Sequence, residues 1–193
     1  MASKMLFALF LLSVLTFYPP STDAAPVKDL HGNIVKNGGR FHILPLFTIA
    51  GGIRRIKTGN ETIPLSVVQS PSEVDNGLPL IITSFARTGF LSTGQATISF
   101  ADDSSLEWTA VAGFPEGTLV KVSGYTYTIR GTFSIKNVRA NIYKLVFCKF
   151  GGDLCGNVAL VGDDAGNRLL GINQKDPYEF VLEEIPSSSA ASK

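Results

Sequence analysis

The two cysteines of the chain, Cys148 and Cys155, can form a disulfide bond or help to hold a metal ion. Cys148 ends an alternating run of strand type, Tyr143–Phe147, and Cys155 comes shortly before a second such run, Val158–Val161. The residues between them, Gly151–Asp153, are typical of turns. The pattern therefore predicts two strands joined by a short loop, with the cysteines at its base.

A metal site needs more ligands than the chain places near these cysteines. Structural zinc takes four protein ligands, and the chain otherwise offers only His31 and His42, both far upstream. The same two histidines are too few and too poorly placed for catalysis. The sequence also lacks a nucleophile elbow, a phosphate-binding loop and a zinc motif. We therefore expect no enzyme activity, no metal and no cofactor.

Two polar segments carry weaker signals. Asn60-Glu61-Thr62 is the only N-glycosylation sequon, and the polar stretch around it predicts an exposed loop. Asp163–Asn167 has the acidic character of a calcium-binding loop, but the later bidentate Glu is missing. A turn is the favoured interpretation of this second segment.

The first residues have the features of a secretory signal peptide. Lys4 supplies a positive charge, and the apolar run Met5–Tyr18 is too short to span a bilayer before Pro19 and Pro20 break it. Cleavage is expected after Ala24. A transmembrane anchor is the competing interpretation, which the short run and the prolines disfavour. Secretion implies an oxidising compartment, in which the two cysteines pair.

Length and charge limit the classes of protein that the chain can belong to. Its 193 residues suit one domain, and 45% apolar against 17% charged residues leave ample material for a core. The net charge is only +1, and no dense basic run occurs. This balance argues against a nucleic-acid-binding or membrane-surface protein.

Short alternating or apolar runs separated by turn residues recur after the leader, and helical periodicity is nearly absent. Many short strands of this kind favour an all-β barrel or sandwich. The number and spacing of the runs also fit a β-trefoil, and the pattern leaves the choice open. Trp108 is expected in the core. The predicted strands are Arg40–Phe47, Pro64–Gln69, Leu80–Ser84, Gln95–Phe100, Leu106–Val111, Leu119–Ser123, Gly131–Lys136, Tyr143–Cys148, Asn157–Val161, Arg168–Asn173 and Tyr178–Leu182.

Several blocks of sequence follow one another in an order typical of one protein family. They are VKDLHGNIVKNGGRFHILP (Val27–Pro45), IAGG (Ile49–Gly52), PLSVVQ (Pro64–Gln69), Glu107-Trp108 and the block from YKLVFC to DDAGNRLL (Tyr143–Leu170). In these blocks the chain resembles the plant Kunitz-type (soybean trypsin inhibitor) family. The resemblance implies an all-β chain folded as a β-trefoil, a pseudo-threefold barrel of about twelve strands, with one disulfide.

The resemblance also implies a division of the chain. Residues 1–24 form the signal peptide, and residues 25–185 form the Kunitz-type inhibitor domain. The small polar tail of residues 186–193 is expected to be disordered.

A second disulfide that is usual in this family is missing. Its first cysteine would precede Pro64-Leu65, where this chain has Ile63, and the region of its partner, Ala101–Ser105, contains no cysteine and looks shortened. Both partners are absent together. We expect Ile63 to replace the bond with a buried apolar contact of about 2–3 kcal/mol.

The resemblance implies an inhibitory loop downstream of the PLSVVQ block. Counting from Pro64 without gaps places Arg87 where trypsin-directed members carry Arg or Lys, and makes Arg87–Thr88 the scissile bond. A guanidinium suits the carboxylate at the base of a trypsin-like specificity pocket. The loop is expected to present Arg87 in an extended, substrate-like shape. Its other residues are Ser84, Phe85, Ala86, Gly89 and Phe90.

Asn37 matches an asparagine that supports this loop in the family. It lies in Asn37-Gly38-Gly39, and a side-chain amide can bridge two backbone groups because it both donates and accepts hydrogen bonds. An ordinary Asn-Gly turn is the alternative interpretation.

The resemblance implies a secreted, monomeric serine protease inhibitor of plant defence, in the apoplast or the vacuole, whose partner is a trypsin-like protease. The alternative is a relative without this activity, such as a storage or miraculin-like protein, or one redirected to cysteine or aspartic proteases. The missing disulfide favours the alternative. So do Gly89, which adds backbone freedom, and Phe85 and Ala86, which replace the proline and tyrosine of strong trypsin inhibitors.

Overall fold

The computed structural model describes residues 24–47, 49–125, 127–151 and 155–186. Apart from Ala24 and Pro186, the predicted signal peptide and tail lie outside the described residues. Within these ranges the chain forms thirteen β-strands and no helix. No described residue therefore belongs to a helix that could span a membrane. The strands are β1 (Arg40–Pro45), β2 (Ile53–Ile56), β3 (Ser66–Gln69), β4 (Leu80–Ser84), β5 (Gly94–Phe100), β6 (Asp103–Phe114), β7 (Gly117–Val122), β8 (Thr128–Ile129), β9 (Gly131–Arg139), β10 (Ile142–Lys149), β11 (Cys155–Gly162), β12 (Arg168–Asn173) and β13 (Glu179–Ile185).

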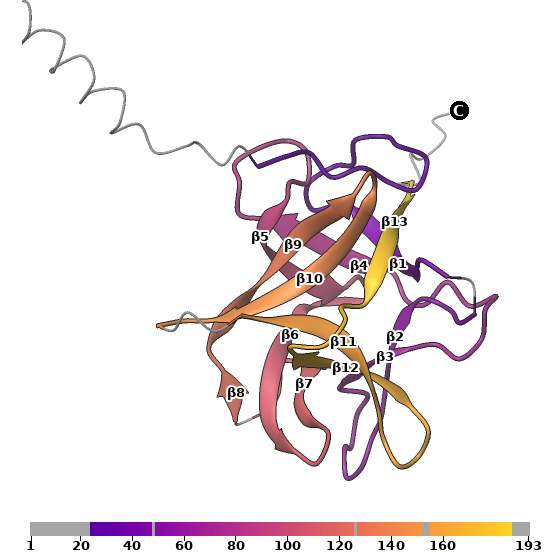
Figure 1. Ribbon diagram of the computed structural model, residues 1–193, viewed down its shortest axis with the longest axis vertical. Coiled ribbons are helices and arrows are strands. Elements are labelled where there is room, and N and C mark those ends of the chain that lie inside the picture. The colour runs from indigo at the N-terminus through magenta and orange to yellow at the C-terminus, as the bar shows by residue number, and fades with distance from the viewer. Residues whose placement is uncertain (1–23, 48, 126, 152–154, 187–193) are drawn as a thin grey trace, which may run out of the picture.

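Six of the strands pair in a closed ring. The order is β13, β1, β4, β5, β9 and β10, and β10 pairs again with β13 to close it. All of these pairings are antiparallel. These strands occupy the upper part of Figure 1. Ring closure leaves no free edge among them, which is how an antiparallel barrel avoids exposing unpaired backbone groups.

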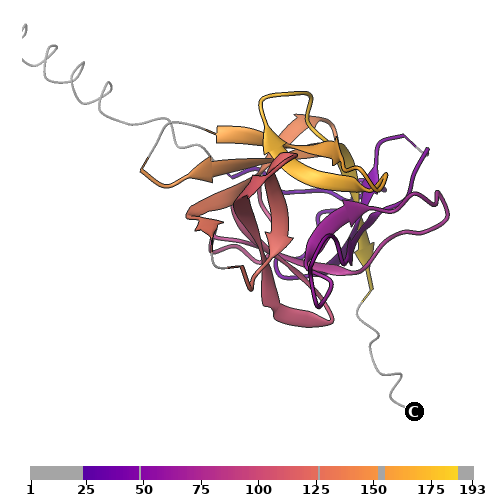
Figure 2. The ribbon, with the colours of Figure 1, turned by 90° about the horizontal axis from the view of Figure 1, so that it is seen from below.

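Three hairpins cover one end of this ring. They are formed by β2 with β3, β6 with β7, and β11 with β12. Further pairings join β3 to β7, β7 to β12 and β12 to β3. Figure 2, seen from below, shows the three hairpins around a common centre. A six-stranded ring with three hairpins in this arrangement is a β-trefoil, which decides between the architectures that the strand pattern left open.

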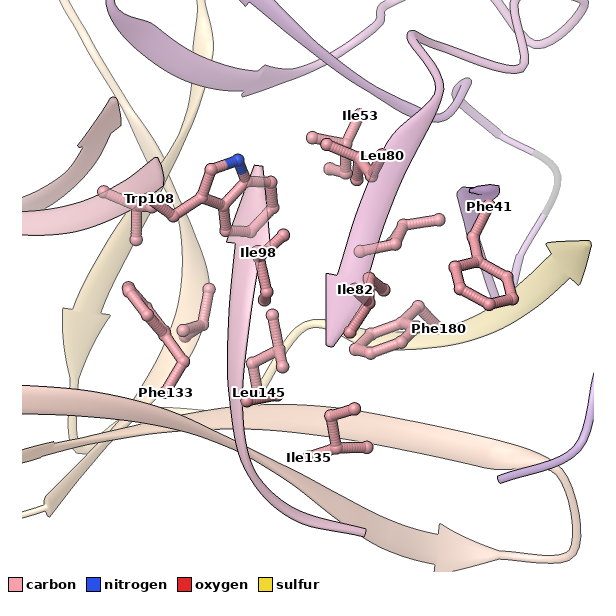
Figure 3. Close-up of a cluster of buried hydrophobic side chains, with 14 of the residues drawn as sticks. Phe41, Ile53, Leu80, Ile82, Ile98, Trp108, Phe133, Ile135, Leu145 and Phe180 are labelled. Atoms are coloured by element: carbon pink, nitrogen blue, oxygen red, sulfur yellow. The ribbon is translucent and has the colours of Figure 1, made fainter. Parts of the chain in front are cut away.

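Alternating side chains explain both the strands and the core. In β10, Tyr143, Leu145 and Phe147 point inward and are buried, whereas the residues between them are only partly buried. Trp108 from β6 packs edge-on against Phe133 from β9, with 6.3 Å between the ring centroids, so its predicted place in the core is confirmed. Figure 3 shows side chains from β1, β4, β5, β6, β9, β10 and β13 meeting in this one cluster.

Eleven of the strands coincide with predicted segments, and β2 and β8 do not. The sequence of β2, Ile-Arg-Arg-Ile, lacks the alternation of a half-buried strand. Its two arginines instead form ion pairs, Arg54 with Asp75 at 3.0 Å and Arg55 with Asp102 at 2.6 Å. The strand β8 has only two residues, Thr128 and Ile129, both of types favoured in strands, and the predicted segments omit it.

The predicted disulfide between Cys148 and Cys155 is present. The two residues lie directly opposite each other where β10 and β11 begin to pair. The bond therefore closes the base of the loop between the two strands, as the two alternating runs indicated. The turn residues Gly152 and Asp153 lie outside the described residues.

The expectation that Ile63 replaces the second disulfide with a buried contact is wrong, because Ile63 is 52% exposed. A buried ion pair holds this segment instead. Lys121 of β7 donates to the Glu61 carboxylate at 2.7 Å, and the two side chains are only 1% and 7% exposed. Lys121 also donates to the hydroxyl groups of Thr58 and Ser66. These contacts attach the segment 58–66 to β7.

Aromatic side chains complete the surroundings of the ion pair. The Lys121 ammonium lies 4.5 Å from the centre of the Phe114 ring and 5.5 Å from that of Tyr125, which are favourable cation–π distances. The Tyr125 hydroxyl donates to Glu61. Burial alone would raise the pKa of Glu61, but hydrogen bonds from Lys121, Tyr125 and Thr58 outweigh it and lower this pKa to about 2. Glu61 is therefore a carboxylate at neutral pH.

The Glu61→Gln substitution keeps the size of this side chain but leaves Lys121 buried without its counter-charge. We expect it to lower the free energy of unfolding by about 3 kcal/mol at neutral pH. The pKa of Glu61 is lowered from 4.5 to about 2, so the stabilisation is complete above the first value and is lost as the pH falls toward the second. Urea unfolding across this pH window should show the parent and the variant converging.

Two further variants serve as controls. Glu73→Gln removes an exposed carboxylate and should change the stability by less than about 0.5 kcal/mol. The double variant Glu61→Gln/Lys121→Met removes both buried charges and should regain part of the loss. An identical pH dependence in the parent and in Glu61→Gln would contradict the assignment.

Candidate functional site

The predicted inhibitory loop joins β4 to β5 and projects from the upper side of the ring in Figure 1. Its first arm leaves β4 at Ser84, which is buried, and the N–H of Phe85 still donates to the Gln95 carbonyl at 3.0 Å. Its second arm returns through Leu91, which is fully buried. Both arms are thus anchored, and the loop between them is free to project.

Arg87 lies at the tip of this loop and is exposed. Its side chain forms no ion pair within the described part of the chain. The backbone departs from the expected extended shape, because the N–H of Thr88 donates to the Ala86 carbonyl at 2.8 Å. This bond makes a tight three-residue turn centred on Arg87. Among the described residues no strand pairs with the loop tip, so the backbone donor bonds to a carbonyl close by in sequence.

The side chain of Asn37 joins the two arms from beneath. Its Oδ1 accepts a hydrogen bond from the N–H of Ser84 at 2.8 Å, and its Nδ2 donates to the Ser84 carbonyl at 3.3 Å. The same Nδ2 lies 3.5 Å from the Thr88 carbonyl, within hydrogen-bonding range. The N–H of Asn37 donates to the Gly89 carbonyl at 3.2 Å. One residue therefore contacts the loop on both sides of Arg87–Thr88.

The turn that carries Asn37 is itself well fixed. The N–H of Gly39 donates to the Lys36 carbonyl at 3.2 Å, and the N–H of Gly38 donates to the Ile82 carbonyl of β4 at 2.9 Å. Gly38 has φ of +70°, a conformation that suits glycine. Asn37 thus lies in an Asn-Gly turn, and its side chain also hydrogen-bonds to Ser84 and reaches the Thr88 carbonyl.

Sequence reasoning missed Ser92, which extends this network. Ser92 is fully buried, and its hydroxyl donates to the Ser84 hydroxyl at 3.1 Å. The Ser84 hydroxyl lies 3.3 Å from the Oδ1 of Asn37 and donates to it. A serine inside a loop carries no local signal for such a role, because its partners come from distant parts of the chain.

The N-terminal segment supports the second arm of the loop. The N–H of Leu91 donates to the Val35 carbonyl at 2.9 Å, and the N–H of Val27 donates to the Leu91 carbonyl at 2.8 Å. Val27 and Val35 are fully buried in the main core cluster. The core of the trefoil thus extends to the base of the loop.

The remaining candidates from the sequence lie apart from this loop. His31 belongs to the N-terminal turn and His42 to β1, and no group of three possible metal ligands occurs among the described residues. Asn60 is exposed in a turn. Asp163–Asn167 forms a turn in which the Asp163 carboxylate accepts hydrogen bonds from the backbone and side chain of Asn167, at 2.7 and 2.8 Å.

The sequence is similar to those of known protease inhibitors. A sequence model of the Kunitz legume family, described as trypsin and protease inhibitor, matches residues 27–184. Trypsin inhibitor A of Glycine max is 35% identical over 100% of this chain and 96% of its own length. Trypsin inhibitor B of Glycine max is also 35% identical, over 84% of this chain and 98% of its own length.

Solved structures are similar to this fold over most of its length. Soybean trypsin inhibitor superposes with a TM-score of 0.76 and 36% identity, covering 83% of this chain and 99% of that one. Its complex with porcine pancreatic trypsin, in an orthorhombic crystal form, gives a TM-score of 0.76, 35% identity and the same coverage. The fold is therefore shared with these proteins.

Replacing Asn37 by alanine tests its contribution to the loop. The variant removes the acceptor of the Ser84 N–H, so we expect this amide to exchange with solvent about tenfold faster, the effect of losing one ordinary hydrogen bond. Amide hydrogen exchange followed by NMR measures the change. Asn167→Ala, which alters a different turn, should leave Ser84 unaffected. Unchanged protection of Ser84 in Asn37→Ala would show that the bridge does not hold the loop.

Proposed function

Because the chain belongs to the plant Kunitz-type family of trypsin and protease inhibitors, we propose that it inhibits a trypsin-like serine protease with the loop between β4 and β5. Members of this family are inhibitors and not enzymes. The relatives are named trypsin inhibitors, and the soybean protein is seen in complex with porcine trypsin. Arg87 and Thr88 are proposed to flank the reactive bond.

Arg87 is suited to enter the specificity pocket of such a protease. The pocket has a carboxylate at its base, and a guanidinium pairs with it through charge-assisted hydrogen bonds. The side chain is exposed and has no ion pair within the described residues, so insertion breaks no salt bridge there. A protease–inhibitor interface of ordinary size buries about 1,600 Å² in total, which requires contacts from the rest of the loop as well.

The Asn37 bridge is the observation that carries this proposal. Its amide contacts Ser84 before the proposed reactive bond and Thr88 after it. If a protease cut Arg87–Thr88, the same side chain would keep both new ends close together. Proximity of this kind raises the effective concentration of the new amine strongly. Re-ligation would then compete with release of the cut loop, and the protease would remain occupied.

One observation favours the alternative of a relative with weak or redirected activity. The hydrogen bond from Thr88 to Ala86 turns the chain at Arg87, and docking in a protease cleft would exchange this bond for contacts with the enzyme. Phe85 is 57% exposed at the tip and would have to fit the enzyme surface too. The strength of inhibition depends on the free energy of this exchange.

We propose that the chain enters the secretory pathway through residues 1–24 and loses them there. The charged, apolar and small-residue regions of this segment are those of a cleavable signal peptide, and the Cys148–Cys155 disulfide suits an oxidising compartment. N-terminal sequencing of protein recovered from a secreting host should begin at Ala25. Retention of Met5–Tyr18 in the mature protein would contradict this proposal.

Titration of trypsin with the purified protein tests the assignment of Arg87. We expect stoichiometric inhibition by the parent and by Arg87→Lys, since both present a cation to the specificity pocket. Arg87→Ala should weaken inhibition by at least about a thousandfold, in the range reported for hot-spot side chains of such interfaces. Residual trypsin activity, measured with a chromogenic substrate, gives all three affinities.

Arg130→Ala is the matched control, because Arg130 is an exposed arginine outside the loop, and it should inhibit as the parent does. Equal inhibition by Arg87→Ala and the parent would show that another bond is reactive. No inhibition by the folded parent would support the alternative function, and cysteine, aspartic and subtilisin-type proteases would then be screened.

A further inference from the structure

A cleft of about 500 Å³ lies apart from the candidate loop and shares no residue with it. Its lining comes largely from the residues just after β1 and from those just before and at the start of β13, and the N–H of Leu46 donates to the Glu179 carbonyl at 3.3 Å. We propose that this cleft binds a small aromatic carboxylate that carries a hydroxyl group on its ring. Its volume lies in the range usual for small-molecule sites. Its apolar lining comes from Pro45, Leu46, Phe47, Ile49, Leu160 and Pro177.

Two buried polar groups that line the cleft have no hydrogen-bond partner among the described residues. They are the Oε1 of Gln69 and the hydroxyl of Tyr178, and the two residues are only 4% and 8% exposed. Buried polar atoms are nearly always hydrogen-bonded, and leaving them unsatisfied lowers stability. A ligand hydroxyl that donates to Gln69 and accepts from Tyr178 would satisfy both atoms.

The Tyr178 hydroxyl is a donor at physiological pH. Burial raises the pKa of Tyr178, and the nearby Gln69 amide and Arg168 guanidinium only partly oppose this rise. The Gln69 side-chain amide lies close enough to the hydroxyl to oppose the rise in its pKa, but the two groups do not meet the geometry of a hydrogen bond. The phenol therefore keeps its proton and can donate it to a ligand oxygen.

Arg168 provides the positive charge of the cleft. It lies opposite Gln69 where β12 pairs with β3, so the cation and the unpartnered acceptor are cross-strand neighbours. Within the described part of the chain its guanidinium forms no ion pair. Two carboxylates also line the cleft: Glu179 is engaged by Arg139 at 3.8 Å, and Asp176 is exposed at the rim. The unpaired guanidinium is suited to a ligand carboxylate.

The apolar walls fit the ring of such a ligand. Phe47 and Ile49 are 70% and 71% exposed, and Leu160 is 36% exposed. Exposed apolar side chains gathered around a concave site commonly mark a binding surface, and covering them with an aromatic ring is favourable. The three requirements together, a flat apolar body, an anionic group and a hydroxyl, define the proposed class of ligand.

Three related compounds test the proposal by isothermal titration calorimetry with the purified, disulfide-bonded protein. The probe is 4-hydroxycinnamate, cinnamate lacks its ring hydroxyl, and methyl 4-hydroxycinnamate lacks its charge. We expect 4-hydroxycinnamate to bind at one site, and each of the other two to bind about tenfold more weakly, as expected for losing one good polar contact. Absence of 4-hydroxycinnamate binding at millimolar concentration overturns the proposal.

Two variants connect the binding to the cleft. Tyr178→Phe removes only the hydroxyl and should reduce the preference for 4-hydroxycinnamate over cinnamate. Because this hydroxyl is unpartnered in the free protein, the substitution should not lower the melting temperature. Arg168→Gln should abolish the preference for the acid over its methyl ester. Arg130→Ala, an arginine outside the cleft, should change neither ratio. Ligand preferences that survive both cleft variants would place the binding elsewhere and refute this site.

The trypsin titration reports on the candidate loop alone, because no residue of the cleft belongs to that loop. Tyr178→Phe and Arg168→Gln should therefore inhibit trypsin as the parent does, if the parent inhibits. Failure of the ligand experiment leaves the proposed inhibitory function intact, and failure of inhibition leaves the ligand proposal intact.

Discussion

The amide side chain of Asn37 is the constraint on which the functional account depends. It hydrogen-bonds to Ser84 and contacts the carbonyl of Thr88, so one side chain spans the tip of an exposed loop. Its own position depends on the trefoil, because the turn around it is bonded to β4 through Gly38. A loop held in this way loses less conformational entropy on binding than a free one. The closed ring of strands therefore determines what the loop can do.

The buried ion pair between Glu61 and Lys121 stabilises the segment where the family resemblance would place a second disulfide. A disulfide restricts the unfolded chain, whereas an ion pair acts only in the folded state and depends on pH. A buried pair adds little over well-packed apolar residues, yet breaking it is costly. The segment that carries Asn60 is therefore held by interactions that strong acid weakens, and the Cys148–Cys155 hairpin is not.

The sequence predicts the structure well wherever neighbouring residues in the chain carry the pattern. The strands β4 and β12 have the predicted bounds, and the alternation around Cys148 and Cys155 predicted the disulfide hairpin. The choice of a β-trefoil and of the loop around Arg87 came from family resemblance, since strand periodicity is the same in a sandwich. Local sequence patterns gave wrong predictions where contacts between distant residues determine the structure. Ile63 is exposed, and its segment is held by the ion pair between Glu61 and Lys121, which lie far apart in the sequence.

Gln69 and Tyr178 illustrate the same limit. In the sequence both have the character of ordinary strand residues. Only the fold brings their unpartnered polar atoms together in one cleft beside Arg168. Ser92 became part of the loop support for the same reason, because its partners are Ser84 and, through it, Asn37. Polar groups of this kind have no sequence periodicity, so their roles can be assigned only from the structure.

The most direct measurement of the central claim follows the proposed reactive bond itself. The protein would be incubated with a catalytic amount of trypsin at mildly acidic pH, and its mass followed over time. We expect one cut, at Arg87–Thr88, and a stable mixture of intact and cut chains that is reached from either pure form. A first cut at another lysine or arginine, or complete conversion followed by degradation, would contradict it.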